Sequence, residues 1–237
     1  ECGVPTSPVC NANCLGCISL QSSECCPSPQ ERITFSPTAE EIAEVGIYHL
    51  SLAPDGIISF GQGCEGEPSL AADRIAEGIR RIRSVTARGQ INMNSNAGFP
   101  DGMKKIVDAG LDSLRVSIIS AHDASYHAYY RANYPLDNVK ESLRYALDHG
   151  VYVSLNLLHF PGFTDRAEEL RAWQEFFRAL PVQMIQMRNL NIDPTLFLQT
   201  MPEAQSAPLG TRAFMEALHA EFPQLVIGSF SHYVTGH

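Results

Sequence analysis

Short apolar runs and helix-like segments alternate along most of the chain, and this alternation limits the possible folds more than any other feature. The apolar runs begin near residues 57, 91, 114, 151 and 184, with a helical pattern between each pair. Such an order predicts βαβ units and therefore a parallel sheet. Right-handed crossovers with the helices on one side would curl that sheet into a partial (β/α)6 barrel, an α/β fold.

Local signals mark where several helices begin. Thr38 and Glu41 have the spacing of a capping box, which predicts a helix from residue 38. Ser69 is expected to cap the next helix, whose apolar stripe faces the core. We expect Trp173, Phe176 and Phe177 to be core residues, because they recur at helical spacing. No break in composition divides the chain, so we expect residues 1–237 to form a single domain.

Polar residues follow the predicted strands at the point where each strand ends. They lie in residues 61–68, in residues 94–98, at Ser117, at Asn156 and at Arg188. In parallel α/β folds the carboxyl ends of the strands form the ligand-binding edge. The sequence therefore predicts a binding site at this edge, with glycines in residues 61–66 allowing close approach of the backbone.

Cys10, Cys14 and Cys17 have C-x3-C-x2-C spacing on a predicted loop. Thiolates this close can converge on one soft metal centre. A four-iron cluster usually takes four cysteines, so three would leave one iron open for chemistry. The alternative is a zinc site completed by Cys25, Cys26 or a histidine. The chain has seven cysteines, six of them in the first 26 residues, a pattern that favours metal binding in a reducing cytoplasm over disulfides.

Composition excludes several classes of protein. The hydrophobic fraction of 44% can supply a core, but no run of about 18 apolar residues predicts a membrane span. The net charge of −9 disfavours nucleic acid as a partner. No signal peptide is visible, so we expect a cytoplasmic protein. The sequence begins at Glu1 without a methionine, and we expect further residues upstream.

Five motifs together resemble the radical S-adenosylmethionine (SAM) superfamily. They are the cysteine triplet, the turn Gly66-Glu67-Pro68, and the segments 94–98, 109–117 and 161–165. The resemblance extends over about residues 4–190. It implies that Cys10, Cys14 and Cys17 bind a 4Fe–4S cluster whose open iron is chelated by the amino and carboxylate groups of SAM.

The resemblance also implies which residues contact SAM. The turn would bind the methionine amino group, and the Glu67 side chain has the alternative role of stabilising the following helix N-terminus. Ser117 would contact the ribose or the carboxylate, and Asn156 the ribose. Arg131 would contact the carboxylate, and Met187 and Arg188 the adenine. The full set of predicted cofactor-binding residues is Gly66, Glu67, Pro68, Asn94, Ser117, Arg131, Asn156, Met187 and Arg188.

The implied activity is reductive cleavage of SAM to a 5′-deoxyadenosyl radical that acts on an unidentified substrate, a small molecule or a peptide. The implied partner is an external electron donor of the flavodoxin or ferredoxin type. The sequence departs from the family where Gly16 replaces an aromatic residue and Glu65 replaces a glycine. No cysteine follows Cys64, so no auxiliary cluster is expected. The alternative function is an iron–sulfur or zinc module in electron transfer or assembly.

Overall fold

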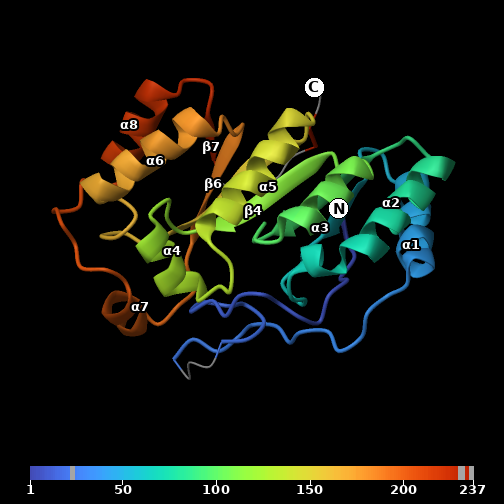
Figure 1. The fold of residues 1–237 in the computed structure, drawn as a ribbon, viewed down its shortest axis with the longest axis horizontal. Coiled ribbons are helices and arrows are strands. Elements are labelled where there is room, and N and C mark those ends of the chain that lie inside the picture. The colour runs from blue at the N-terminus through green and yellow to red at the C-terminus, as the bar shows by residue number, and fades with distance from the viewer. Residues whose placement is uncertain (22–24, 229–232, 235–237) are drawn as a thin grey trace.

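A computed structural model describes residues 1–21, 25–228 and 233–234. Within these residues the fold is one parallel sheet of seven strands in sequential order (Figure 1). The strands are β1 (Cys2–Gly3), β2 (Ile57–Phe60), β3 (Gln90–Ser95), β4 (Ser113–Ile118), β5 (Tyr152–His159), β6 (Met184–Asn189) and β7 (Val226–Gly228). β1 and β7 lie at opposite edges, so the barrel is not closed. The predicted α/β partial barrel is therefore confirmed.

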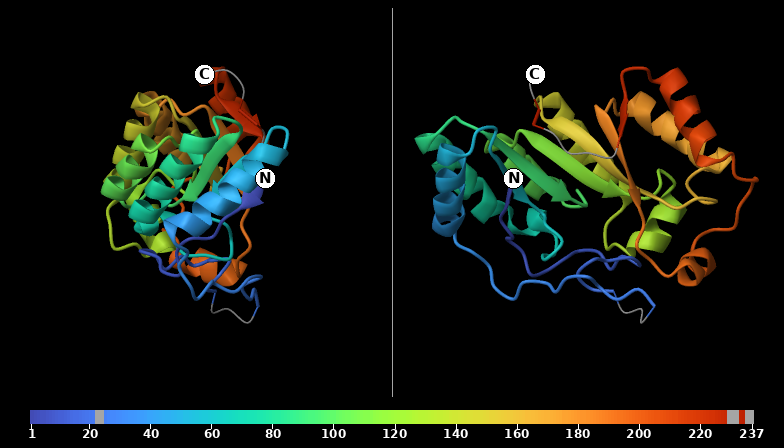
Figure 2. Two further views of the ribbon diagram at one scale, coloured as in Figure 1. Left: turned by 90° about the vertical axis from the view of Figure 1, so that its right-hand side faces the viewer. Right: turned by 180° about the vertical axis from the view of Figure 1, so that it is seen from behind.

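Helices cover the outer face of the sheet, while its inner face is open from behind (Figures 1 and 2). The helices are α1 (Ala39–Leu52), η1 (Pro68–Ala71, a 3-10 helix), α2 (Ala72–Val85), α3 (Pro100–Asp108), α4 (Asp123–Tyr130), α5 (Leu136–Asp148), α6 (Ala167–Ala179), α7 (Pro194–Thr200) and α8 (Thr211–Glu221). Along the sheet α1 packs on α2, α2 on α3, α3 on α5, and α6 on α8.

Apolar and polar residues alternate along the strands, so the two faces of the sheet differ and the inner face is polar. In β4, Leu114, Val116 and Ile118 are fully buried, whereas Ser113, Arg115 and Ser117 are half-buried. Residues paired across parallel strands point to the same side, so Asn156 of β5 and Gln186 of β6 share a face with Ser117. The apolar set packs beneath the helices, and the polar set faces the inside of the partial barrel.

The start of α1 agrees with the sequence, but the start of α2 does not. Thr38 accepts a hydrogen bond from the Glu41 N–H, and Glu41 accepts one from the Thr38 N–H, as in a capping box. The expected Ser69 cap is wrong, because Ser69 lies inside η1 and donates its N–H to the carboxylate of Glu67. Glu67 is thus the residue that caps this turn.

Two peripheral elements were not predicted. β7 has three residues, one of them exposed, and so lacks the apolar run that marks the central strands. The helix α7 has seven residues, and its start is capped by Asp193, which accepts hydrogen bonds from the N–H groups of Thr195 and Leu196. Both are shorter than the segments that periodicity can identify.

Trp173 is fully buried in α6 and anchors an aromatic group at this end of the core. Its ring stacks on Phe177, with centroids 5.5 Å apart, and meets Phe176 edge to face. Trp173→Ala should lower the free energy of unfolding by about 3–5 kcal/mol, because it leaves a large cavity. Urea unfolding measures this, with Leu198→Ala on the exposed side of α7 as the control. A loss below about 1 kcal/mol would contradict this packing.

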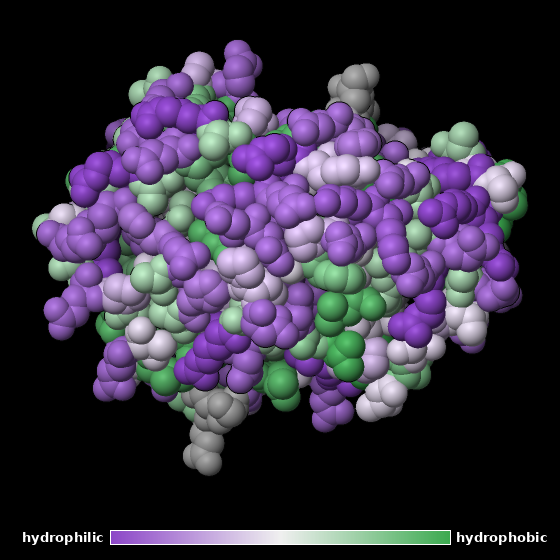
Figure 3. All heavy atoms as spheres, viewed as in Figure 1, coloured by the Kyte–Doolittle hydropathy of each residue, from purple (hydrophilic) through white to green (hydrophobic). Residues whose placement is uncertain are grey.

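Hydrophilic side chains dominate the helical face of the molecule (Figure 3). The amphipathic helices therefore turn their polar sides outward, as their burial patterns require. Among the described residues, none of the helices combines the length and the apolar character needed to cross a bilayer.

Candidate active site

The cysteine loop lies across the carboxyl ends of the strands, where the end of α4 holds it. The N–H of Asn13 donates to the carbonyl of Tyr130 at 2.9 Å, and that of Leu15 donates to the carbonyl of Tyr129 at 3.0 Å. The last carbonyl groups of a helix have no partner within the helix. They are used here to fix the backbone between Cys10 and Cys17.

The turn at Gly66 packs directly against the segment that leads into Cys10. The N–H of Gly66 donates to Ser7 O at 2.7 Å, and that of Glu67 donates to Val9 O at 2.8 Å. A Cβ atom on residue 66 would lie 2.0 Å from Val9 O, which is a backbone atom. Glycine is therefore required here for close approach of two backbones.

Gly66→Ala should push the turn away from the cysteine loop and weaken binding of the iron that the resemblance implies. The added methyl group collides with backbone, which cannot move aside as a flexible side chain can. We expect a loss of about 1–3 kcal/mol in unfolding free energy and a clear drop in bound iron after anaerobic reconstitution. Gly66→Val should lose more of both. Full iron binding in both variants would show that the contact with Val9 is not needed.

Glu65 ties together the segments on either side of the site. One carboxylate oxygen accepts hydrogen bonds from the N–H and hydroxyl of Thr6 and from the N–H of Ser7, at 2.6, 3.0 and 2.9 Å. The other accepts from the N–H groups of Gly61 and Gln62, at 2.6 and 3.1 Å. The side chain is 4% exposed. Glu65 thus joins the approach to the cysteine loop to the end of β2.

Glu67 is also buried, and its carboxylate joins the turn to the end of β3. It accepts hydrogen bonds from the Ser95 hydroxyl at 2.6 Å, from the Asn96 N–H at 2.8 Å and from the Ser69 N–H at 3.0 Å. Burial raises the pKa of this carboxyl, and the three hydrogen bonds oppose that effect. The side chain therefore orders the turn, and Glu67 is also one of the residues that line the cavity described next.

A cavity of about 160 Å³ lies between the cysteine loop and the strand ends. Two of its polar atoms, the side-chain oxygen Oδ1 of Asn94 and the hydroxyl of Tyr130, are buried without a hydrogen-bond partner in the structure. Such atoms are costly to bury unless something satisfies them. The predicted site residues among those that line the cavity are Cys10, Cys14, Cys17, Gly66, Glu67, Pro68, Asn94 and Ser117.

The other predicted site residues lie outside this lining. Asn156 is next to Ser117 by strand register, and its Oδ1 is buried without a partner. Met187 and Arg188 are half-buried on β6, and an Arg188 N–H donates to Gln186 Oε1 at 3.1 Å. Arg131 is exposed at the end of α4, with φ of 46°. The structure therefore brings eight of the twelve predicted residues to one cavity and leaves these four around it.

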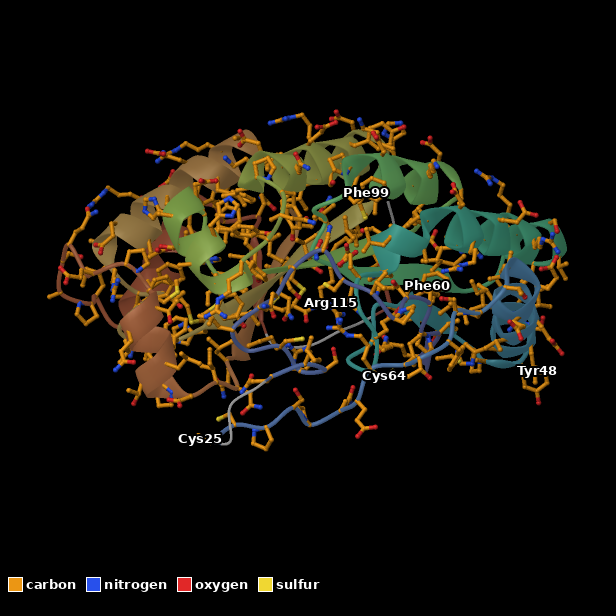
Figure 4. All side chains as sticks on the ribbon, turned by 60° about the horizontal axis from the view of Figure 1, so that its bottom comes forward. Cys25, Tyr48, Phe60, Cys64, Phe99 and Arg115 are labelled. Atoms are coloured by element: carbon orange, nitrogen blue, oxygen red, sulfur yellow. The ribbon has the colours of Figure 1, made fainter. Side chains whose placement is uncertain are left out.

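Three further cysteines, Cys25, Cys26 and Cys64, are separate from the cavity lining. Cys25 is exposed at the outer margin of its loop, and Cys26 is half-buried (Figure 4). Cys64 lies on the turn after β2, where its carbonyl accepts a hydrogen bond from the Ile33 N–H at 2.7 Å. None of these three thiols lines the cavity.

The three thiols at the cavity are suited to a metal centre. Burial raises the pKa of Cys14, with the charges of Cys10 and Cys17 adding to the effect. Burial, followed by the charge of Glu67, also raises the pKa of Cys10. Clustered thiols become thiolates when a cation replaces their protons. In the described part of the chain no three His, Cys, Asp or Glu side chains are placed to hold a single ion, and these three cysteines line one cavity.

Sequence reasoning missed three residues that shape this site. Glu65 enters the sequence analysis only as a departure from the resemblance, and no sequence pattern marks Tyr130. Arg32 lies in a polar segment, residues 18–37, that has no periodicity. A buried acid among backbone donors is visible only in three dimensions, so no sequence signal would have identified the part played by Glu65.

A family model for the "Radical SAM superfamily" matches residues 4–173. The chain belongs to the radical SAM superfamily. The predicted resemblance is confirmed, and so, at the level of the family, is the expectation of a radical SAM enzyme. Among curated protein sequences, none matches this chain.

Several solved structures share the fold at low sequence identity. SuiB of Streptococcus suis, solved with S-adenosylmethionine, is 13% identical with a TM-score of 0.65, covering 98% of this chain and 51% of that one. The [FeFe]-hydrogenase maturase HydG is 17% identical with a TM-score of 0.63, covering 95% and 50%. A radical SAM methyltransferase from Sphaerobacter thermophilus is 18% identical with a TM-score of 0.63, covering 99% and 66%. The chain thus spans about half of the first two proteins.

Proposed function

We propose that this radical SAM protein holds a 4Fe–4S cluster on Cys10, Cys14 and Cys17 and binds SAM in the adjoining cavity. The observation that carries the proposal is that the three cysteines and the Gly66-Glu67-Pro68 turn line one cavity. When bound, this pair supplies reductive cleavage of SAM to methionine and a 5′-deoxyadenosyl radical, which takes hydrogen from a substrate.

The residues around the cavity fit such a ligand. The unpartnered oxygens of Asn94 and Asn156 would accept hydrogen bonds from the hydroxyl or amino groups of SAM. Ser117 would add a hydroxyl from the neighbouring strand, and the turn at Gly66 would offer backbone carbonyls. Met187 and Arg188 would form the adenine side of the pocket, and Arg131 would close over the carboxylate from the end of α4.

The role of the protein is to position the reactants and to exclude water. The polar inner face of the sheet orients SAM, while the cysteine loop covers the strand ends. We propose that residues 1–237 act as one core domain in the reducing cytoplasm, where all seven cysteines stay free of disulfides. An external electron donor of the flavodoxin or ferredoxin type would deliver the electron. The substrate would be a small molecule or a peptide, and nucleic acid is disfavoured by the charge.

The alternative of an iron–sulfur or zinc module in electron transfer or assembly gains no support from the family match. Electron paramagnetic resonance (EPR) tests the proposal. After anaerobic reconstitution, about four irons and four sulfides should bind per chain. Adding SAM to the reduced protein should then change the EPR spectrum, because SAM binds the open iron. A spectrum that SAM does not alter would contradict the proposal, even if the cluster is intact.

A further inference from the structure

Arg32 comes from a segment without secondary structure, yet backbone hydrogen bonds fix it at the cavity. The N–H of Gln30 donates to Ile18 O at 3.3 Å, and that of Ile33 donates to Cys64 O at 2.7 Å. These two bonds hold the chain on both sides of Arg32 against the cysteine loop and the turn after β2. Arg32 is the one basic residue among the described residues that line the cavity.

The guanidinium of Arg32 is directed at a cysteine ligand. Its Nη2 lies 3.7 Å from the sulfur of Cys17, within hydrogen-bond range for sulfur. Its Nε donates to the hydroxyl of Ser19 at 3.2 Å. That hydroxyl also lies 3.6 Å from the Cys17 sulfur and 3.3 Å from the carbonyl of Glu65. Ser19 therefore orients the guanidinium toward Cys17.

We propose that Arg32 sets the reduction potential of the cluster through Cys17, an inference that rests on the proposed 4Fe–4S site. Reduction adds one electron to the cluster, supplied by dithionite or by the external donor, and no covalent bond forms or breaks. A guanidinium beside a ligating sulfur stabilises the more negative, reduced state. The buried carboxylates of Glu65 and Glu67 at the same cavity act in the opposite direction. Arg32 offsets them, so that the cluster can be reduced.

The experiment is an EPR-monitored redox titration of the reconstituted protein without SAM. Arg32→Gln removes the charge but keeps a polar side chain. At a fixed applied potential we expect the ratio of reduced to oxidised cluster in this variant to fall about tenfold. This corresponds to a shift of the midpoint potential by about 59 mV to more negative values. Arg32→Lys keeps the charge but loses the planar guanidinium. Its midpoint potential should therefore lie between those of the wild type and Arg32→Gln. Arg80→Gln removes an equal charge from the exposed side of α2 and should leave the potential unchanged.

Two outcomes would overturn the inference. One is an unchanged potential in an Arg32→Gln protein that carries a full complement of iron and sulfide. The other is an unchanged potential with weaker SAM binding, which would make Arg32 a ligand of SAM instead. If Arg32→Gln does not assemble a cluster, Arg32→Met, which also removes the charge, is titrated in its place: a negative shift supports the role, and a wild-type potential refutes it. A wild-type protein that binds no cluster would defeat the proposed function, a distinct result.

Discussion

Glu65→Ala is expected to destabilise the protein by about 3 kcal/mol and to abolish cluster binding. The substitution leaves five donors without their acceptor, from Thr6, Ser7, Gly61 and Gln62. Water can satisfy some of them, but it cannot join the two segments as one carboxylate does. The approach to Cys10 would then separate from the turn at Gly66.

Two measurements check this expectation. Urea unfolding of the metal-free protein gives the loss of stability, and iron and sulfide analysis after reconstitution gives the loss of the cluster. Glu65→Gln should also lose stability and cluster binding. Its amide replaces one acceptor oxygen with an N–H donor, which then faces the N–H donors already there. Glu44→Ala on the exposed side of α1 is the matched control and should leave both quantities unchanged. Wild-type iron content in Glu65→Gln would show that the carboxylate does not order the loop.

Cys14→Ala is expected to remove the cluster altogether. Cys14 is the middle thiol of the loop and lines the cavity between Cys10 and Cys17. With two cysteines left, the cluster loses a protein ligand that no described thiol at the cavity can replace. Iron and sulfide should fall to background, together with the brown colour and the EPR signal of the reduced protein.

Cys25→Ala is the matched control, because Cys25 is exposed and does not line the cavity. Its iron content, colour and EPR signal should equal those of the wild type. An iron-loaded Cys14→Ala protein, or a Cys25→Ala protein without iron, would mean that the cluster has a different set of ligands.

Local periodicity was enough to predict the central part of the fold. The five central strands lie where the apolar runs place them, and the Thr38–Glu41 capping box forms as predicted. These features depend on residues close in sequence, which is why a pattern can identify them. The alternation of parallel strands and helices also brings the cysteine loop and the Gly66 turn to one edge of the sheet.

What could not be predicted depends on contacts between distant segments. Glu65 accepts a hydrogen bond from Thr6, which lies 59 positions earlier in the sequence. Arg32 reaches Cys17 only because its loop folds back on the turn after β2. Ser69 was expected to cap a helix, but Glu67, placed by Ser95 and Asn96, is the cap and accepts the N–H of Ser69. In each case a side chain binds a partner that the local sequence does not specify.

The most direct test of the central claim, that this protein cleaves SAM at the cluster, is the formation of 5′-deoxyadenosine. The reconstituted protein is incubated anaerobically with dithionite and SAM, and the products are separated by liquid chromatography. The wild type should form 5′-deoxyadenosine, and Cys14→Ala should form none. No product above the Cys14→Ala background, from a wild-type protein with a full cluster, would contradict the account.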